Sequence, residues 1–216
     1  MTGVGTAIAG ECATVLQLRI GSARGRLVVP GRFARGNRND SKNQFCCLLV
    51  SDDGGQTWTS GAAGPQGTWD GTAIERGDGS ILLSVQGKSD HKRRTLISRD
   101  GGTTLGDVAI EHGTERVEDG IMSSMLALTT PAGTRAVFAG LLEGEKAMTL
   151  RLSADEGRTW PVLGAVKPFA TAALKMRSGR GTVEILPDKT SLLVAGQEGL
   201  QVLGIPGPTA KAKAKP

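Results

Sequence analysis

One short pattern, Ser-x-Asp-x-Gly-x-Thr, occurs three times in this chain of 216 residues and constrains the fold more than any other feature. With each residue type at a usage of about 7%, a four-position match arises at a given site with odds on the order of 10⁻⁵. The copies begin at positions 51, 98 and 153, so the intervals are 98 minus 51, or 47, and 153 minus 98, or 55. Such intervals are typical of a repeated supersecondary unit. We call the copies box 1 (51–58), box 2 (98–105) and box 3 (153–160).

Each box predicts the tip of a β-hairpin. An apolar strand precedes each copy, the Asp can accept backbone N–H groups across a tight turn, and the Gly supplies the positive φ that such a turn needs. The Trp then returns on the next strand to pack, and in box 2 Leu105 takes its place. The residues expected to build the turns are Ser51, Asp53, Gly55, Thr57 and Trp58 in box 1, Ser98, Asp100, Gly102 and Thr104 in box 2, and Ser153, Asp155, Gly157, Thr159 and Trp160 in box 3.

The rest of the chain also predicts short strands and no helix. The 32 Gly and 9 Pro indicate many turns, as in an all-β antiparallel protein. Units of roughly 50 residues would make about four sheets in a single domain, residues 1–204, followed by a disordered Pro/Ala/Lys tail, residues 205–216. Strands are expected at residues 25–30, 45–50, 80–85, 95–97, 135–139, 148–152, 181–186, 191–195 and 200–204.

The charge of the chain gives no reason to expect a nucleic-acid partner. The net charge is +5, but Lys211, Lys213 and Lys215 lie in the tail, which leaves 5 minus 3, or +2, for the body. That surplus is small, and no nucleic-acid-binding motif accompanies it.

Cysteine content and hydropathy exclude other classes. Cys12, Cys46 and Cys47 fit neither a disulfide scaffold nor a zinc pattern, so we expect small buried hydrophobes, no metal and no cofactor. Residues 1–18 lack the basic leader and apolar core of a signal peptide, and no stretch reaches the ~20 apolar residues of a transmembrane segment. The chain as given is therefore expected to be soluble and cytoplasmic.

Together with two further segments, the boxes resemble the sialidase (neuraminidase) family. The segments are Gly25-Arg26-Leu27-Val28-Val29-Pro30 and Glu75-Arg76-Gly77-Asp78-Gly79-Ser80-Ile81-Leu82-Leu83. The resemblance implies a six-bladed β-propeller of four-stranded antiparallel blades, of which about four would be present, in an incomplete ring or one closed differently. It also implies exo-α-sialidase activity on sialylated glycans. In that family a Tyr attacks, a Glu is its base, an Asp is the acid/base, and three Arg bind the substrate carboxylate.

Carried over residue by residue, the resemblance implies a degenerate catalytic set. Asp70 stands where the family has its Glu, and the neighbouring Trp69 is suited to stacking on a sugar. Two positions of the arginine clamp hold Gln86 and Glu145, and Arg180 stands where the nucleophile is expected. The chain contains no Tyr at all.

Several other charged residues are expected to be structural or solvated. Asp70 and Glu75 would point to opposite faces of a regular strand. The run from His91 to Arg94 is expected to be a solvated hairpin loop, and Arg151 an outward-facing strand residue. The only other histidine, His112, has no nucleophile nearby in the sequence, so no catalytic triad is expected.

Three functions remain open. The first is a sialidase acting on sialylated glycans, with weak or no activity as this chain alone. The alternative is a non-catalytic propeller that binds a glycan or a protein. The third is a degenerate or truncated product whose exposed sheet edges would make it aggregate.

Overall fold

A computed structural model of the chain shows an all-β protein. It describes residues 8–9, 15–37, 39–87, 90, 92–110, 124–130, 133–141, 148–160, 162–166, 181–185, 191–196 and 199–204. Within these residues the chain forms four antiparallel sheets and one short 3-10 helix, η1 (Ser41–Asn43). The predicted antiparallel all-β class is confirmed. The tail, residues 205–216, lies outside the described residues.

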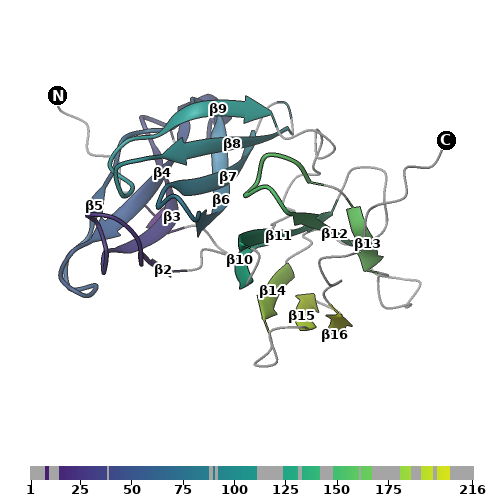
Figure 1. Ribbon diagram of the computed structural model, residues 1–216. Coiled ribbons are helices and arrows are strands. Elements are labelled where there is room, and N and C mark those ends of the chain that lie inside the picture. Colours follow the sequence, from purple (N-terminus) through teal and green to yellow (C-terminus); the bar gives the residue numbers. More distant parts are fainter. Residues whose placement is uncertain are drawn as a thin grey trace.

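The four sheets follow one another along the chain as meanders (Figure 1). Sheet 1 contains β1 (Ile8–Ala9), β2 (Leu16–Gln17), β3 (Leu27–Ala34), β4 (Gln44–Ser51) and β5 (Thr59–Ser60). Sheet 2 contains β6 (Thr68–Glu75), β7 (Ile81–Gly87), β8 (Arg93–Ser98) and β9 (Gly106–Ile110). Sheet 3 contains β10 (Ser124–Thr130), β11 (Gly133–Leu141), β12 (Met148–Ser153) and β13 (Val162–Val166). Sheet 4 contains β14 (Gly181–Ile185), β15 (Ser191–Gly196) and β16 (Gly199–Gly204).

Sheet 1 also has a four-stranded arrangement, because β1 and β2 share one edge. Both pair with β3 on the side opposite β4, so they form one interrupted outer strand. The order across sheet 1 is therefore β1 with β2, then β3, β4 and β5. Sheets 2 and 3 run in simple order, β6 to β9 and β10 to β13.

Consecutive sheets pack face to face. Strand β6 contacts β3 and β4 of sheet 1, and β10 contacts both β6 and β14. Figure 1 shows sheets 1 and 2, in purple to teal, side by side, and sheets 3 and 4, in green and yellow, beyond them. Strand β7 is buried along its whole length, because sheet 1 covers one of its faces and sheet 3 the other. Its sequence, ILLSVQG, accordingly has no polar-apolar alternation at its start.

Among the described residues, two hydrophobic clusters lie between sheets. The larger joins sheets 1 and 2, and the smaller joins sheets 2 and 3. The first consists of Leu18, Val28, Cys46, Leu48, Val50, Ala73, Ile81, Leu83, Val85 and Leu96. The second consists of Ile74, Leu82, Met125 and Trp160.

Candidate functional site

The strand register gives the described sheets two distinct ends. Strands β4, β8 and β12 each end at the Ser that opens a box, namely Ser51, Ser98 and Ser153. We call this the box end. The start of β6 lies beside the start of β4 at the other end, where Cys46 N donates to Thr68 Oγ1 at 2.9 Å. We call that the opposite end.

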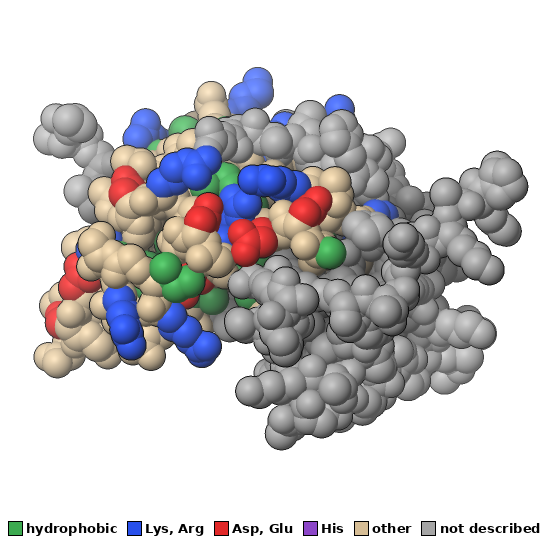
Figure 2. Space-filling model, in the orientation of Figure 1, with side chains coloured by type: hydrophobic (Ala, Val, Ile, Leu, Met, Phe, Trp, Pro, Cys, Tyr) green, Lys and Arg blue, Asp and Glu red, His purple; other side chains and the backbone are tan. Residues whose placement is uncertain are grey.

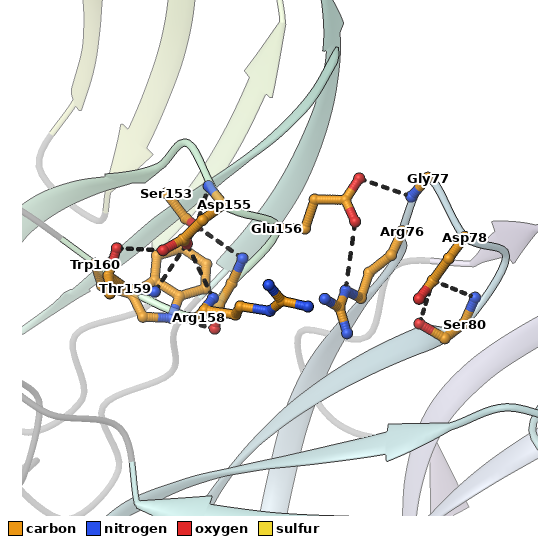
Figure 3. A network of polar contacts seen from close by, with 11 residues as sticks. Arg76, Gly77, Asp78, Ser80, Ser153, Asp155, Glu156, Arg158, Thr159 and Trp160 are labelled. Atoms are coloured by element: carbon orange, nitrogen blue, oxygen red, sulfur yellow. Dashed lines mark hydrogen bonds and ion pairs between the residues drawn. The ribbon is translucent and has the colours of Figure 1, made fainter.

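The three boxes form the same hydrogen-bonded turn. In box 3, Asp155 Oδ1 accepts from the hydroxyl of Ser153 at 2.7 Å and from Thr159 N at 2.8 Å. Thr159 Oγ1 donates to Asp155 Oδ2 at 2.5 Å, and Gly157 N donates to Ser153 Oγ at 2.7 Å (Figure 3). Boxes 1 and 2 repeat these four bonds through Ser51, Asp53, Gly55 and Thr57, and through Ser98, Asp100, Gly102 and Thr104.

The boxes differ in how their last residue packs. Trp160 is buried in the second hydrophobic cluster, and Leu105 packs against the first. Trp58 is 40% exposed, although its indole N–H donates to Gly55 O at 3.0 Å as that of Trp160 does to Gly157 O at 3.1 Å. The packing expected of the last residue is thus found in boxes 2 and 3 and is only partial in box 1.

Box 3 also holds sheet 3 to sheet 2. Glu156 has a φ of 59°, a left-handed conformation that no other described non-glycine residue adopts. Its Oε1 accepts from Gly77 N at 3.0 Å and its Oε2 lies 3.8 Å from Arg76 Nε (Figure 3). These contacts reach the turn between β6 and β7, so they offset the backbone strain at Glu156.

Hydrogen bonds keep the box carboxylates ionised. The hydroxyl and N–H of Thr57, with Ser51, lower the pKa of Asp53 to about 2. Partial burial raises the pKa of Asp100 and Asp155, but the bonds from the threonine, the backbone and the serine together outweigh it, so both pKa values are lowered. The turns therefore depend on charged carboxylates.

Acid is expected to destabilise the protein only below about pH 4. The unfolded-state pKa of Asp is about 3.9, and the folded pKa of Asp53 is lowered to about 2. The stabilisation is fully present above the unfolded value and is lost as the pH falls through the folded one. Urea midpoints measured between about pH 6 and pH 2 should decline in that window. Asp53→Asn should flatten the decline, and an unchanged curve would contradict the assignment.

At the opposite end, a β-bulge lies where the sequence places Trp69 and Asp70. The pairing of β6 with β7 shifts register between Thr68, which faces Gly87, and Gly71, which faces Val85. Bulges redirect side chains and occur next to active sites. The bulge places Trp69 and Asp70 in β6 beside the end of β7, which contains Gln86. The side chain of Asp70 itself lies outside the described residues, so the expectation that it and Glu75 point oppositely is untested.

An arginine that the sequence analysis missed lies over Trp69. The guanidinium carbon of Arg32, on β3, is 4.2 Å from the centroid of the Trp69 ring. Arg32 pairs with Cys46 in the sheet and shares its face with Val28, so it points toward sheet 2. The signal available in the sequence was the position of Arg32 four residues after Val28, since residues i and i+4 of a strand lie on the same face.

A second arginine-aromatic cluster lies nearby on sheet 1. Phe33 and Phe45 stack with centroids 5.4 Å apart and an interplanar angle of 14°. The guanidinium of Arg35 lies over both rings, at 5.6 Å and 5.0 Å. The end of β3 and the start of β4 thus carry two guanidinium groups on aromatic faces, a geometry that suits contact with an anionic ligand.

The expectation for the run from His91 to Arg94 is wrong for Arg93. Arg93 belongs to β8 and is 2% exposed, with Nε and Nη2 donating to Ser84 Oγ at 3.1 Å and 2.7 Å. It pairs with Gln86 in the sheet. The strand therefore begins inside the charged run, and this cation is buried next to a position where the resemblance expects an arginine.

Arg151 is also placed differently from the prediction. It is 7% exposed, and its Nη1 donates to Trp160 O at 2.8 Å. An outward-facing strand residue would be in solvent, whereas Arg151 ties β12 to the end of box 3.

Glu75 is a structural anchor. Its carboxylate accepts from the backbone N–H of Arg19, at 2.9 Å to each oxygen, and from that of Ile20 at 3.0 Å. Both donors lie in the turn between β2 and β3. The carboxylate therefore ties sheet 2 to sheet 1 instead of being a solvated charge.

The described residues contain no group of three or more His, Cys, Asp or Glu placed to hold a metal ion. Burial raises the pKa of Cys46 and Cys47 to about 11, so both thiols stay protonated. In the part of the chain that the structure covers, no helix has the length and apolar character to cross a membrane.

Charges of both signs mix on the surface. Figure 2 shows Lys and Arg interspersed with Asp and Glu over the described part of the face turned to the viewer. The described part of this face shows no continuous basic stripe of the kind that nucleic acids select. Four residues of the sequence analysis, Cys12, His112, Glu145 and Arg180, lie outside the described residues, as does His91.

The known proteins to which this chain is similar include sialidases. No family model matches the chain. A sialidase of Micromonospora viridifaciens is 27% identical over 183 residues, which is 81% of this chain and 26% of that protein. The chain thus spans about a quarter of the length of this curated relative.

Solved structures agree on the fold. A leech intramolecular trans-sialidase has a TM-score of 0.66 at 17% identity, covering 88% of this chain and 31% of that one. The Hadza microbial sialidase Hz136 has a TM-score of 0.60 at 20% identity, covering 83% and 35%. By sequence and by fold, the chain is similar to sialidases over part of their length.

Proposed function

We propose that this chain acts on sialylated glycans as part of a sialidase-type β-propeller. Its four sheets would be four blades and its boxes Asp-box repeats. As this chain alone it would bind the glycan with weak or no hydrolysis, because none of its residues is a Tyr that could serve as the nucleophile. The sequence relationship supports the family, and the trans-sialidase with a similar fold was solved with 2,7-anhydro-Neu5Ac.

The observation that carries the proposal is the pairing of Arg32 with Trp69. Sialic acid carries a carboxylate, which a guanidinium can bind through two parallel N–H groups, and an apolar sugar face, which an indole can contact. Both groups lie at the opposite end. Arg32 is in β3, and Trp69 is in β6, next to Asp70. The boxes lie at the other end, so they serve the fold and leave this end to the ligand.

Binding is tested with 3′-sialyllactose, with lactose as the uncharged comparison. The chain should bind the sialylated sugar and not lactose, and Trp69→Ala and Arg32→Ala should each weaken binding by about tenfold. Arg24→Ala is the matched control, because Arg24 is an exposed arginine in the turn between β2 and β3, at the box end. Titration by NMR measures the affinity and shows whether each variant is folded. Equal affinity for lactose would contradict the proposal.

Hydrolysis is a separate measurement. A fluorogenic α-sialoside, assayed between about pH 4 and pH 7, a range in which the box carboxylates stay ionised, should show little or no release by the chain. Release that is lost in Asp70→Ala would mean that Asp70, or water activated by it, replaces the missing nucleophile.

The alternative is a non-catalytic propeller that binds a protein or a different glycan. The partly buried aromatic residues at the opposite end, together with Arg32 and the exposed Arg35, support that alternative as well. The alternative is favoured if the folded chain binds no sialylated sugar but binds a protein or another glycan, and if Trp69→Ala weakens that binding.

A further inference from the structure

The start of β6 is fastened to β4 by the hydroxyl of Thr68. Cys46 N donates to Thr68 Oγ1 at 2.9 Å, and Thr68 Oγ1 donates in turn to Pro65 O at 2.5 Å. Thr68 is 1% exposed, so both bonds lie in a low-dielectric environment in which they are strong. One buried hydroxyl thus holds the first residue of β6 against sheet 1.

The chain just before Thr68 also runs beside β4. Gly67 N donates to Gln44 O at 2.9 Å, and Gly67 has a φ of 75°, a conformation that side-chain-bearing residues rarely adopt. Thr68 then pairs with Gly87 of sheet 2. The chain therefore passes from sheet 1 into sheet 2 at Thr68, which makes hydrogen bonds to the first and pairs with the second.

Strand β6 is held again directly after the bulge. Gly71 pairs with Val85, and a Cβ added to Gly71 would lie 2.7 Å from both Ser84 O and Val85 Cγ1. Sheet 2 thus packs against the bare backbone at this position. The bulge, with Trp69 in it, is therefore a short span that is fixed at both ends.

The hydroxyl of Thr68 connects the two members of the candidate site. Arg32 pairs with Cys46 across β3 and β4, and the N–H of Cys46 is the donor to Thr68 Oγ1. Thr68 immediately precedes Trp69, whose ring centroid lies 4.2 Å from the guanidinium carbon of Arg32. Since a cation–π contact requires the cation to lie over the ring face, the bond to Thr68 helps to set this contact.

We infer that Thr68 is the positioning residue of the Arg32–Trp69 site. Its hydroxyl holds the Trp69 ring against the Arg32 guanidinium before a ligand binds, so neither group has to be ordered on binding. Thr68 is itself buried, so it acts through Trp69 and does not touch the ligand. The inference rests on the proposed function for its ligand, whereas the geometry that it concerns is a property of the free chain.

The first test is the affinity for 3′-sialyllactose. Thr68→Val removes the hydroxyl, keeps the branched shape and should weaken binding by about tenfold. Thr68→Ser keeps the hydroxyl and should bind within about twofold of the unaltered chain. Thr68→Ala leaves room for water at the two backbone groups, so it replaces Thr68→Val if the valine variant does not fold.

Thr72→Val is the matched control. Thr72 lies in the same strand, is fully buried, and its Oγ1 accepts from Met125 N at 2.9 Å. The substitution therefore removes an equivalent hydrogen bond, but one that joins sheet 2 to sheet 3. It should lower the urea midpoint about as much as Thr68→Val and leave the affinity unchanged.

The second test is proton NMR of the free chain. The ring current of Trp69 should shift the side-chain protons of Arg32, and the loss of this shift in Trp69→Ala identifies them. Thr68→Val should reduce the shift, whereas Thr68→Ser and Thr72→Val should retain it. A chain that binds no sialylated sugar would contradict the proposed function alone, because the NMR shift still decides the role of Thr68.

Three results would overturn the inference. The first is a Thr68→Val variant that retains the NMR shift of Arg32. The second is a Thr68→Ser variant that loses the shift as Thr68→Val does. The third is a Thr72→Val variant that reduces the shift or the affinity as much as Thr68→Val, because Thr68 would then contribute only general stability.

Discussion

Arg93→Ala is expected to lower the free energy of unfolding by about 3 kcal/mol, through loss of a buried side chain and of its hydrogen bonds. Arg93 is among the largest fully buried side chains of the described residues, and its guanidinium donates twice to Ser84 Oγ. Truncation leaves a cavity in sheet 2 and removes donors from buried polar groups. Urea unfolding monitored by fluorescence measures the loss, and the m-value shows whether the transition stays two-state.

Arg94→Ala is the control for Arg93→Ala. Arg94 is the next residue in β8, and its ion pair with Asp90 has Nη2 and Oδ2 2.5 Å apart. Both side chains are partly exposed, at 22% and 36%, so solvent screens the pair and the expected loss is below about 1 kcal/mol. Equal losses for the two variants would show that the burial of Arg93 does not stabilise the fold.

The sequence predicted those parts of the fold that depend on local chemistry. The boxes are local, since each turn is closed by residues at most four positions apart, as in Ser51 to Gly55. Apolar runs next to boxes, such as residues 45–50, correspond to β4 (Gln44–Ser51). Strand β6 (Thr68–Glu75) was not predicted, because Trp69-Asp70-Gly71 interrupts its alternation at the bulge.

The rest depends on contacts between segments that are not adjacent in the sequence, which no local pattern encodes. Arg93 and Arg151 are charged, so the sequence predicted that they lie in solvent, but both are buried and donate to Ser84 and Trp160. Glu75 was weighed as a surface charge, and its partners, Arg19 and Ile20, lie more than 50 positions away in the chain. For the candidate site, sequence supplied Trp69, whereas Arg32 joined it only through the packing of β3 against β6.

The interfaces between sheets also explain why three similar boxes have different roles. The hydrogen bonds within each turn are equivalent, so they contribute similarly to each hairpin. Boxes 2 and 3 in addition join one sheet to the preceding one, and box 1 has no such contact in the described chain. A substitution at the same box position should therefore have effects that depend on the presence of a preceding sheet.

Gly157→Ala is expected to destabilise the protein by about 3 kcal/mol, and Gly55→Ala by about 1 to 2 kcal/mol. Both glycines have positive φ, 88° and 95°, so the backbone strain from a Cβ is equivalent. At Gly157 the Cβ also collides with Leu82 of sheet 2, whereas at Gly55 it makes ordinary contact with Leu27 Cδ1, 3.6 Å away. The difference between the two losses of unfolding free energy, measured in urea, therefore reports how much the contact of box 3 with sheet 2 contributes.

Combining Gly157→Ala with Leu82→Ala tests the contact between box 3 and sheet 2 directly. Removing the Leu82 side chain makes room for the new Cβ, so the double variant should lose less than the sum of the two single losses, by about 1 kcal/mol or more. The same Leu82→Ala change combined with Gly55→Ala should be additive, because the two sites share no contact. Additivity in both pairs would mean that box 3 does not rest on sheet 2.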